Sequence, residues 1–136
     1  MTSIKKILLI LMIIFVSMIL VFKVINPNQI STTNYTESYL ASLKEAAVLY
    51  DDTDYHAGEI PMRTVIKATG VITKTDGKNS PSIKKSDRFI LELSDGQTKL
   101  HIINQSATDF SLHDTVTIYG EYNGIIKADL VEISDK

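Results

Sequence analysis

The apolar run near the N-terminus constrains this chain more than any other feature. From Ile7 to Ile25 only Ser17 and Lys23 are not apolar. A lysine near the end of such a run can extend its amine to the membrane surface. At about 1.5 Å per residue the run rises roughly 28 Å, which is close to the hydrocarbon thickness of a bilayer. Residues 7–25 therefore predict a transmembrane signal anchor held in the lipid bilayer.

Lys5 and Lys6 precede the run and predict its orientation. Because basic residues collect on the cytoplasmic side, residues 1–6 are expected to form a cytoplasmic tail. The rest of a single-pass protein of the cell membrane is then expected outside. A cleaved signal peptide is the alternative, although the run is longer than such peptides need and no Ala-x-Ala-like site follows. The lack of cysteine excludes a lipid-anchored lipoprotein and a disulfide framework.

The charges divide unevenly along the chain. Three of the 14 basic residues lie in the first 25 positions, so the remaining 11 stand against 16 acidic residues, a formal charge of −5. Binding of nucleic acid depends on neutralising phosphates, so an acidic domain counts against a nucleic-acid partner.

Residues 26–59 are expected to hold a linker and an amphipathic helix. Residues 26–35 are polar and contain a proline. Residues 36–50 place Tyr39, Leu43 and Ala47 on one apolar stripe, which predicts a helix packed on the domain that follows. A partner-binding or membrane-lying helix is the alternative.

Residues 51–59 gather four carboxylates and His56, which suggests a metal site. A calcium loop beginning at Asp52 needs glycine and glutamate where the chain has Ala57 and Arg63. The template fails, and a solvated loop is predicted.

After Ile60 the apolar period changes from helical to two, which predicts strands. Asp95-Gly96 and Asn123-Gly124 predict two tight hairpin turns. A slip in the alternation is expected in the last strand. The five predicted strands cover residues 63–74, 89–94, 98–104, 114–123 and 125–134. The residues predicted to face the core are Ile66, Ala68, Gly70, Ile72, Phe89, Leu91, Leu93, Leu100, Ile102, Val116, Ile118, Gly120, Tyr122, Ile126, Ala128, Val131 and Ile133.

Five short strands cannot bury both faces of an open sheet, whereas a closed barrel removes the edges. Residues 60–134 are therefore predicted to be a barrel. The expected fold class is all-β: a five-stranded OB-fold barrel preceded by an N-terminal transmembrane helix and one amphipathic helix.

The predicted strand plan is similar to that of a known fold. A bent first strand, a hairpin, a crossing segment and a second hairpin form the OB-fold layout. The stretches "TGVI", "DTVTIYGEY" and "ADLVEI" resemble the bacterial OB-fold families of exported or membrane-tethered proteins, including the tRNA-anticodon-binding-like group. His113-Asp114 departs from the Gly-Asp pair that often precedes the fourth strand there.

An anchor followed by an outer OB domain is also similar to the haem chaperones of cytochrome c maturation. Those proteins carry a haem-attaching histidine beyond the last strand. His56, His101 and His113 all lie earlier here, so the resemblance implies the architecture and not the haem role.

OB-folds bind ligands beside the loop between the first two strands. Residues 74–88 hold five basic and two acidic residues. Single-strand binders stack bases on exposed aromatic rings, and none can be placed there from the sequence. A merely solvated basic loop is the alternative. The candidate ligand-binding residues are Lys78, Lys84, Lys85, Arg88, Lys99 and His101.

The chain shows no catalytic, phosphate-cradling or zinc-protease motif, so neither an enzyme nor a cofactor is expected. The predicted function is a membrane-anchored extracytoplasmic binding or scaffolding module that engages a protein or peptide of the cell envelope. The alternative is a binder of single-stranded nucleic acid that acts through Lys84, Lys85 and Arg88.

Overall fold

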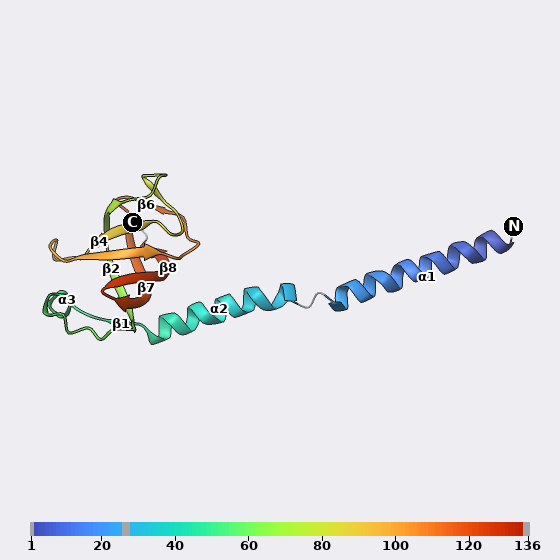
Figure 1. Cartoon of the computed structure of the whole chain (residues 1–136), viewed down its shortest axis with the longest axis horizontal. Coiled ribbons are helices and arrows are strands. Elements are labelled where there is room, and N and C mark those ends of the chain that lie inside the picture. Colours follow the sequence, from blue (N-terminus) through green and yellow to red (C-terminus); the bar gives the residue numbers. More distant parts are fainter. Residues whose placement is uncertain (1, 26–27, 135–136) are drawn as a thin grey trace. The chain divides into compact units, whose positions relative to one another are not determined.

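The computed structural model describes the backbone of residues 2–25 and 28–134, and the side chains of residues 3–18 and 36–134. The chain separates into two units, residues 1–38 and residues 39–136 (Figure 1). The first unit contains α1 (Thr2–Ile25) and the beginning of α2 (Asn28–Ala46). The polar stretch that the sequence predicts as a linker is therefore helical from Asn28.

The predicted membrane anchor is corrected by the structure. Among the described residues, no helix combines the length and the apolar character needed to cross a membrane. Residues 19–25 lie outside the described side chains. The predictions of a transmembrane segment over residues 7–25 and of a cell-membrane location are therefore wrong.

The second unit contains the rest of α2, one short helix and all the strands. In chain order, these elements are β1 (Val48–Leu49), α3 (Asp52–Ala57), β2 (Thr64–Thr75), β3 (Ser82–Ile83), β4 (Arg88–Glu92), β5 (Lys99–Asn104), β6 (Phe110–Ser111), β7 (Thr115–Asn123) and β8 (Ile125–Ile133).

The strands close into a five-stranded mixed barrel (Figure 1). The sheet order is β1-β2-β4-β5-β8-β7, and β7 pairs back with β2. The pair β5–β8 is parallel, whereas the other barrel pairs are antiparallel. This order is that of an OB-fold-like barrel, as the sequence predicts. The expected all-β class is corrected to a mixed barrel with N-terminal helices.

The length of β2 lets it pair with two neighbours. Residues 64–71 pair with β7, and residues 71–75 pair with β4. Gly70 lies where β2 passes from one neighbour to the other, and a Cβ there would collide with the backbone oxygen of Glu92. A bulge follows between Ile72 and Lys74. Glycine at position 70 permits the backbone of β4 to approach β2 closely, and β2 bends here as the sequence predicts.

The core lies inside the barrel and confirms most of the predicted alternation. The inward residues of β2, β4 and β5 are buried, as are Val116, Ile118 and Val131 on β7 and β8. The register shifts between Tyr119 and Gly120, where the slip puts Val131 inside. Ile133 was expected inside but is 46% exposed, so that prediction is wrong.

The C-terminal part of α2 packs on the outside of the barrel. Tyr39 donates a hydrogen bond of 2.8 Å to Asp129, and Lys44 forms an ion pair of 2.5 Å with Glu132. The amines of Lys44 and Lys67 lie 5.6 and 5.7 Å from the ring centre of Tyr119. The expected helix over residues 36–50 is corrected, because α2 ends at Ala46 and β1 follows it; Leu43 of the predicted stripe is buried, whereas Tyr39 is 48% exposed.

The predicted solvated loop over residues 51–59 is wrong, because α3 occupies much of it. Asp51 accepts a hydrogen bond from the Asp54 amide at 2.9 Å, and Asp54 accepts one from the Asp51 amide at 3.1 Å. This reciprocal cap satisfies the first turn, and Gly58 ends the helix in the left-handed region with φ +67°. The acidic residues that suggest a metal site therefore fold a helix.

Candidate functional site

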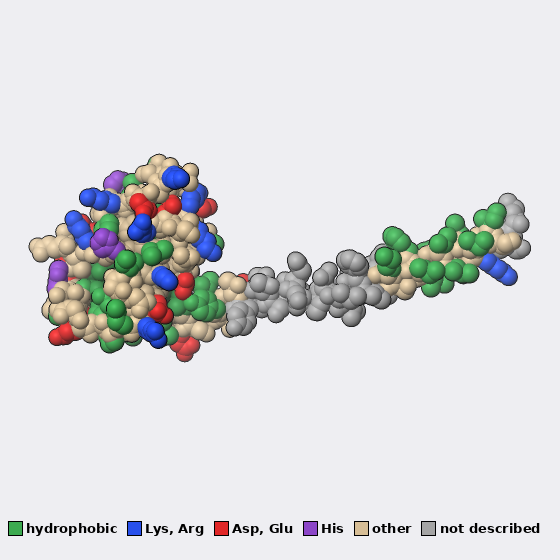
Figure 2. All heavy atoms as spheres, in the orientation of Figure 1, with side chains coloured by type: hydrophobic (Ala, Val, Ile, Leu, Met, Phe, Trp, Pro, Cys, Tyr) green, Lys and Arg blue, Asp and Glu red, His purple; other side chains and the backbone are tan. Residues whose placement is uncertain are grey.

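The outward side chains of β2, β4, β5 and β8 form one surface, which we call the β4–β5 face. Cα partners on neighbouring strands align these side chains in rows: Lys74 with Ile90, Ile90 with His101, and Ile103 with Lys127. Figure 2 shows Lys, Arg and His side chains interspersed with hydrophobic ones on the visible side of the barrel. The β4–β5 face comprises Lys74, Asp76, Arg88, Ile90, Glu92, Lys99, His101, Ile103, Ile125 and Lys127.

A hollow of about 320 Å³ opens on this face. Its apolar part includes Ile90 and Ile125, and Ile125 is 44% exposed although it begins a strand. Lys74, Arg88 and His101 supply polar groups at its walls. The residues that line the hollow are Lys74, Thr75, Asp76, Arg88, Phe89, Ile90, His101, Ile102 and Ile125.

The cation of Arg88 is fixed at the edge of the hollow by Asp76. The Arg88 Nε donates to Asp76 at 3.0 Å, and the Arg88 amide donates to the same carboxylate at 2.8 Å. The bond from this amide, helped by the guanidinium, holds the pKa of Asp76 below its usual range. The terminal guanidinium nitrogens of Arg88 have no partner among the described residues, so they can bind an anion.

The structure brings together only some of the predicted ligand-binding residues. Arg88 and His101 line the hollow, and Lys99 lies beside it, 3.9 Å from Glu92. Lys84 instead lies 3.7 Å from Asp109, outside the hollow. Neither Lys78 nor Lys85 lines it.

The site also contains residues that the sequence reasoning missed. Lys74, Ile125 and Lys127 come from strands that are distant in sequence from the β4–β5 hairpin. The exposed Ile125 beside the predicted Asn-Gly turn was a usable signal, because an apolar residue at a turn invites an explanation.

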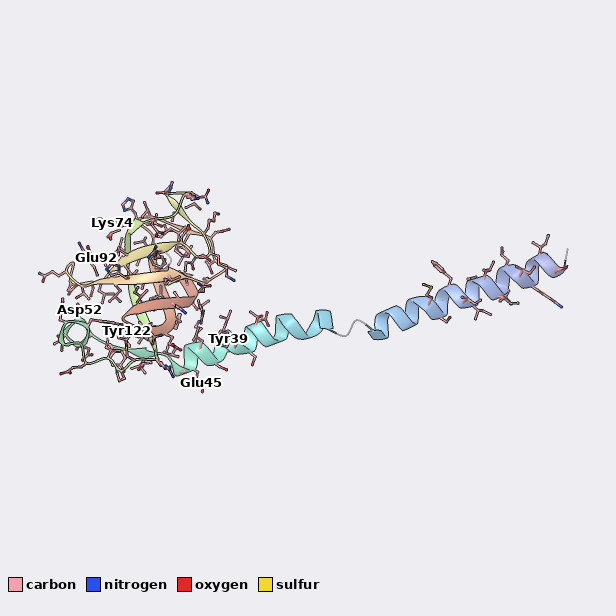
Figure 3. The ribbon with its side chains drawn as sticks, in the orientation of Figure 1. Tyr39, Glu45, Asp52, Lys74, Glu92 and Tyr122 are labelled. Carbon is pink, nitrogen blue, oxygen red and sulfur yellow. The ribbon has the colours of Figure 1, made fainter. Side chains whose placement is uncertain are left out.

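A second, smaller hollow of about 190 Å³ lies where α3 meets the barrel. Tyr55 and Tyr122 contact each other edge to face, with ring centres 6.3 Å apart and planes at 64°. His101 lines both hollows. In Figure 3, Tyr122 and Lys74 lie toward opposite ends of the barrel. The residues lining this second hollow are Tyr55, His56, Thr98, Lys99, Leu100, His101, Tyr122 and Gly124.

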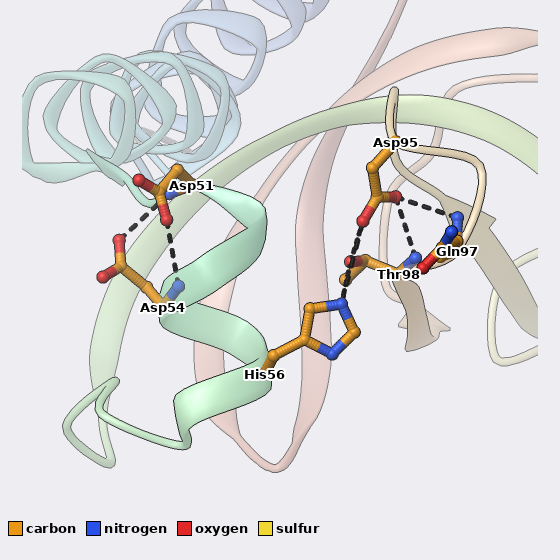
Figure 4. Close-up of polar contacts among 6 residues, drawn as sticks. All are labelled: Asp51, Asp54, His56, Asp95, Gln97 and Thr98. Carbon is orange, nitrogen blue, oxygen red and sulfur yellow. Dashed lines mark hydrogen bonds and ion pairs between the residues drawn. The ribbon is translucent and has the colours of Figure 1, made fainter.

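His56 joins α3 to the turn between β4 and β5 (Figure 4). The Thr98 hydroxyl donates to Asp95 at 2.5 Å and lies 2.8 Å from His56 Nε2, which therefore serves as its donor. Although a hydroxyl between histidine and aspartate is reminiscent of an activated nucleophile, Thr98 is only 4% exposed. This contact holds the turn and the helix together.

Asp95 makes the stability of this turn depend on acid. The hydrogen bond from the Thr98 hydroxyl, with those from the Thr98 and Gln97 amides, lowers the pKa of Asp95 to about 2. Because the pKa is depressed in the fold, this contribution is present above about pH 4 and is lost as the pH falls toward about 2.

Between about pH 4 and pH 2, the urea concentration at the midpoint of unfolding should fall less for Asp95→Asn than for the wild type. Asp109→Asn, at an exposed carboxylate, serves as the control and should keep the acid dependence of the wild type. If Asp95→Asn also keeps that dependence, Asp95 is not the group that makes the turn sensitive to acid.

Comparison with known proteins assigns this chain to no family. No family model matches the chain, and no curated protein matches it. Among solved structures, a chain from the crystal structure of yeast Stn1 and Ten1 is similar, with 18% sequence identity and a TM-score of 0.38. The match covers 54% of this chain and 44% of that one, so this chain spans less than half of its length. The resemblance to exported bacterial OB-fold families stays a prediction.

Proposed function

We propose that the barrel is a binding module for single-stranded nucleic acid and that the β4–β5 face receives the strand. The observation that carries the proposal is the hollow of about 320 Å³ with apolar walls and cations at its edge. Phosphates need cations, and bases need an apolar or flat surface away from water. Both lie on this face within one depression.

The charge of the face differs from that of the domain around it. Four cations, Lys74, Arg88, Lys99 and Lys127, stand against Asp76 and Glu92, which leaves the face a formal +2. The chain beyond residue 25 has a formal charge of −5. The folded barrel therefore concentrates positive charge that the overall composition hides, and this removes the main objection to a nucleic-acid ligand.

The apolar part of the face suits bases better than sugar hydroxyls. Ile90, Ile103 and Ile125 lie on neighbouring strands among the cations. An apolar surface ringed by positive charge favours a ligand whose anionic backbone is separate from its flat, weakly polar groups. A single strand has this division, whereas a duplex keeps its bases covered.

The module is proposed to bind without catalysing a reaction. The envelope protein partner is not proposed, because it was expected on the strength of a membrane anchor that the structure does not support. Direct binding to the exposed face requires no such anchor.

Fluorescence anisotropy with a labelled oligothymidylate of about 12 nucleotides tests the proposal. We expect the logarithm of the association constant to fall against that of salt concentration with a slope of about −2, the value for roughly three phosphate contacts. Arg88→Gln and Lys74→Gln should each weaken binding and make the slope shallower. No binding at low salt, or binding that is insensitive to salt, would refute the function.

Lys67→Gln provides the matched control. Lys67 lies on β2 like Lys74, but its amine is above Tyr119 and it lines a different, acidic hollow with Asp51, Asp52 and Asp54. Its loss removes the same charge from the same strand. Equal weakening by Lys67→Gln and Lys74→Gln would mean that only net charge matters, which would contradict a site on the β4–β5 face.

A further inference from the structure

The second hollow contains what the β4–β5 face lacks, namely a group of aromatic rings. On the face itself, His101 is the only ring-bearing side chain among the outward residues described there. Tyr55 and His56 come from α3, and Tyr122 comes from β7. These three side chains line the second hollow together with His101. Rings from separate parts of the chain therefore meet at one point.

The hydroxyl of Tyr55 is a second reason to regard the second hollow as a ligand site. Tyr55 Oη is buried and has no hydrogen-bond partner among the described residues. Burial, followed by the nearby Tyr122, raises the pKa of Tyr55 to about 12, so the hydroxyl keeps its proton and remains a donor. A buried donor without a partner is uncommon in folded proteins and calls for an explanation. Tyr55 lines the hollow, and a shift of the side chains that cover its hydroxyl would expose this donor to a carbonyl or ring nitrogen of a ligand bound there.

The two hollows are adjacent at His101, which lines both of them. Lys99 precedes His101 on the outward side of β5 and lines the second hollow, where it can meet a phosphate. Figure 3 places Lys74 and Tyr122 toward opposite ends of the barrel, so a ligand that reaches both must be extended. A strand with a repeating phosphate and a flat group at each step has this form.

From these observations we infer that the second hollow is a nucleobase subsite, in which one base of the bound strand is held by Tyr122 and accepts a hydrogen bond from Tyr55. This inference rests on the proposed function, because it places one nucleotide of the same ligand. It assigns to α3 a part in binding, since Tyr55 and His56 belong to that helix. The base enters beyond His101, and its phosphate lies near Lys99.

The first test needs no variant of the protein. Oligothymidylates of about six nucleotides, each with an abasic position at a different step, are compared by anisotropy with the full chain. We expect loss of the base near one end to weaken binding roughly tenfold, the size of a lost stacking contact, with smaller losses elsewhere. Binding of the intact oligonucleotide with equal losses at every step would overturn the subsite while leaving the proposed function in place. No binding of the intact oligonucleotide would overturn both.

Variants then assign the base to the hollow. Tyr122→Leu should weaken binding of the intact strand and abolish the penalty of the sensitive abasic step, while Tyr122→Phe, which keeps the ring, should bind as the wild type does. Tyr55→Phe removes only the unpartnered hydroxyl, so the fold should persist and binding should weaken several-fold. If Tyr55→Phe binds as tightly as the wild type and Tyr122→Leu keeps the abasic penalty, the base lies elsewhere.

Discussion

Replacing Gly120 by valine should destabilise the barrel by about 3 kcal/mol or more, the upper part of the range for forcing atoms into a packed interior. A Cβ at this position would collide with the carbonyl oxygen of Lys127 and approach the Cα of Ala128. Both are backbone atoms of β8, so no side chain can turn away to make room. The strand would have to move, and β7 pairs with β2 as well as with β8.

Urea denaturation measures this loss, and Gly96→Ala separates it from the ordinary cost of removing a glycine. Gly96 has a φ of +67°, but a Cβ there meets no heavy atom within 4 Å. Its replacement should cost about 1 kcal/mol, because only the left-handed backbone is penalised. Equal losses at both positions would show that backbone conformation, and not the approach of β8, makes Gly120 necessary.

Replacing Phe89 by alanine is expected to cost about 3 to 5 kcal/mol, as large-to-small changes in packed cores do. Phe89 is 2% exposed, and its ring meets that of Phe110 edge to face with centres 5.4 Å apart. Phe110 belongs to β6, which pairs with β3 outside the main sheet. The alanine variant would leave a cavity between the barrel and this small two-stranded sheet.

Ile90→Ala is the matched control for that experiment. Ile90 follows Phe89 on β4, but its side chain faces the opposite way, toward the hollow. Its truncation should cost less than about 1 kcal/mol, because a partly exposed side chain loses little burial. Thermal melting of both variants gives the comparison. Equal melting temperatures for Phe89→Ala and Ile90→Ala would contradict the assignment of Phe89 to the core.

The sequence was sufficient for the barrel strands because each strand has one buried side. Phe89, Leu91 and Leu93 alternate with residues that are partly or fully exposed, and such a period of two is visible without any tertiary information. The slip before Val131 was also detectable, since a bulge moves the apolar set by one position. The prediction for Ile133 failed because the last residue of a strand can continue the alternating pattern although no core side chains lie next to it.

Helix α3 and the hollows could not be derived in the same way. The six residues of α3 are too few for a periodic apolar stripe, although Asp51 with Asp54 and Gly58 carried capping signals at its ends. The hollow joins Lys74, His101 and Ile125 from three strands. Alternation predicts that such residues point outward, but only the closed strand order makes them neighbours.

The parallel pair of β5 and β8 has a consequence for folding during synthesis on the ribosome. β8 follows the other described strands in sequence, and it lies between β5 and β7 in the closed barrel. While a ribosome still holds residues 125–133, the earlier strands can form hairpins but cannot seal the cylinder. The edge of β5 that later pairs with β8 is then unpaired, and the side chain of Ile102 remains exposed to water. The emergence of β8 from the ribosome, and not the formation of the earlier hairpins, is therefore the event that completes the barrel.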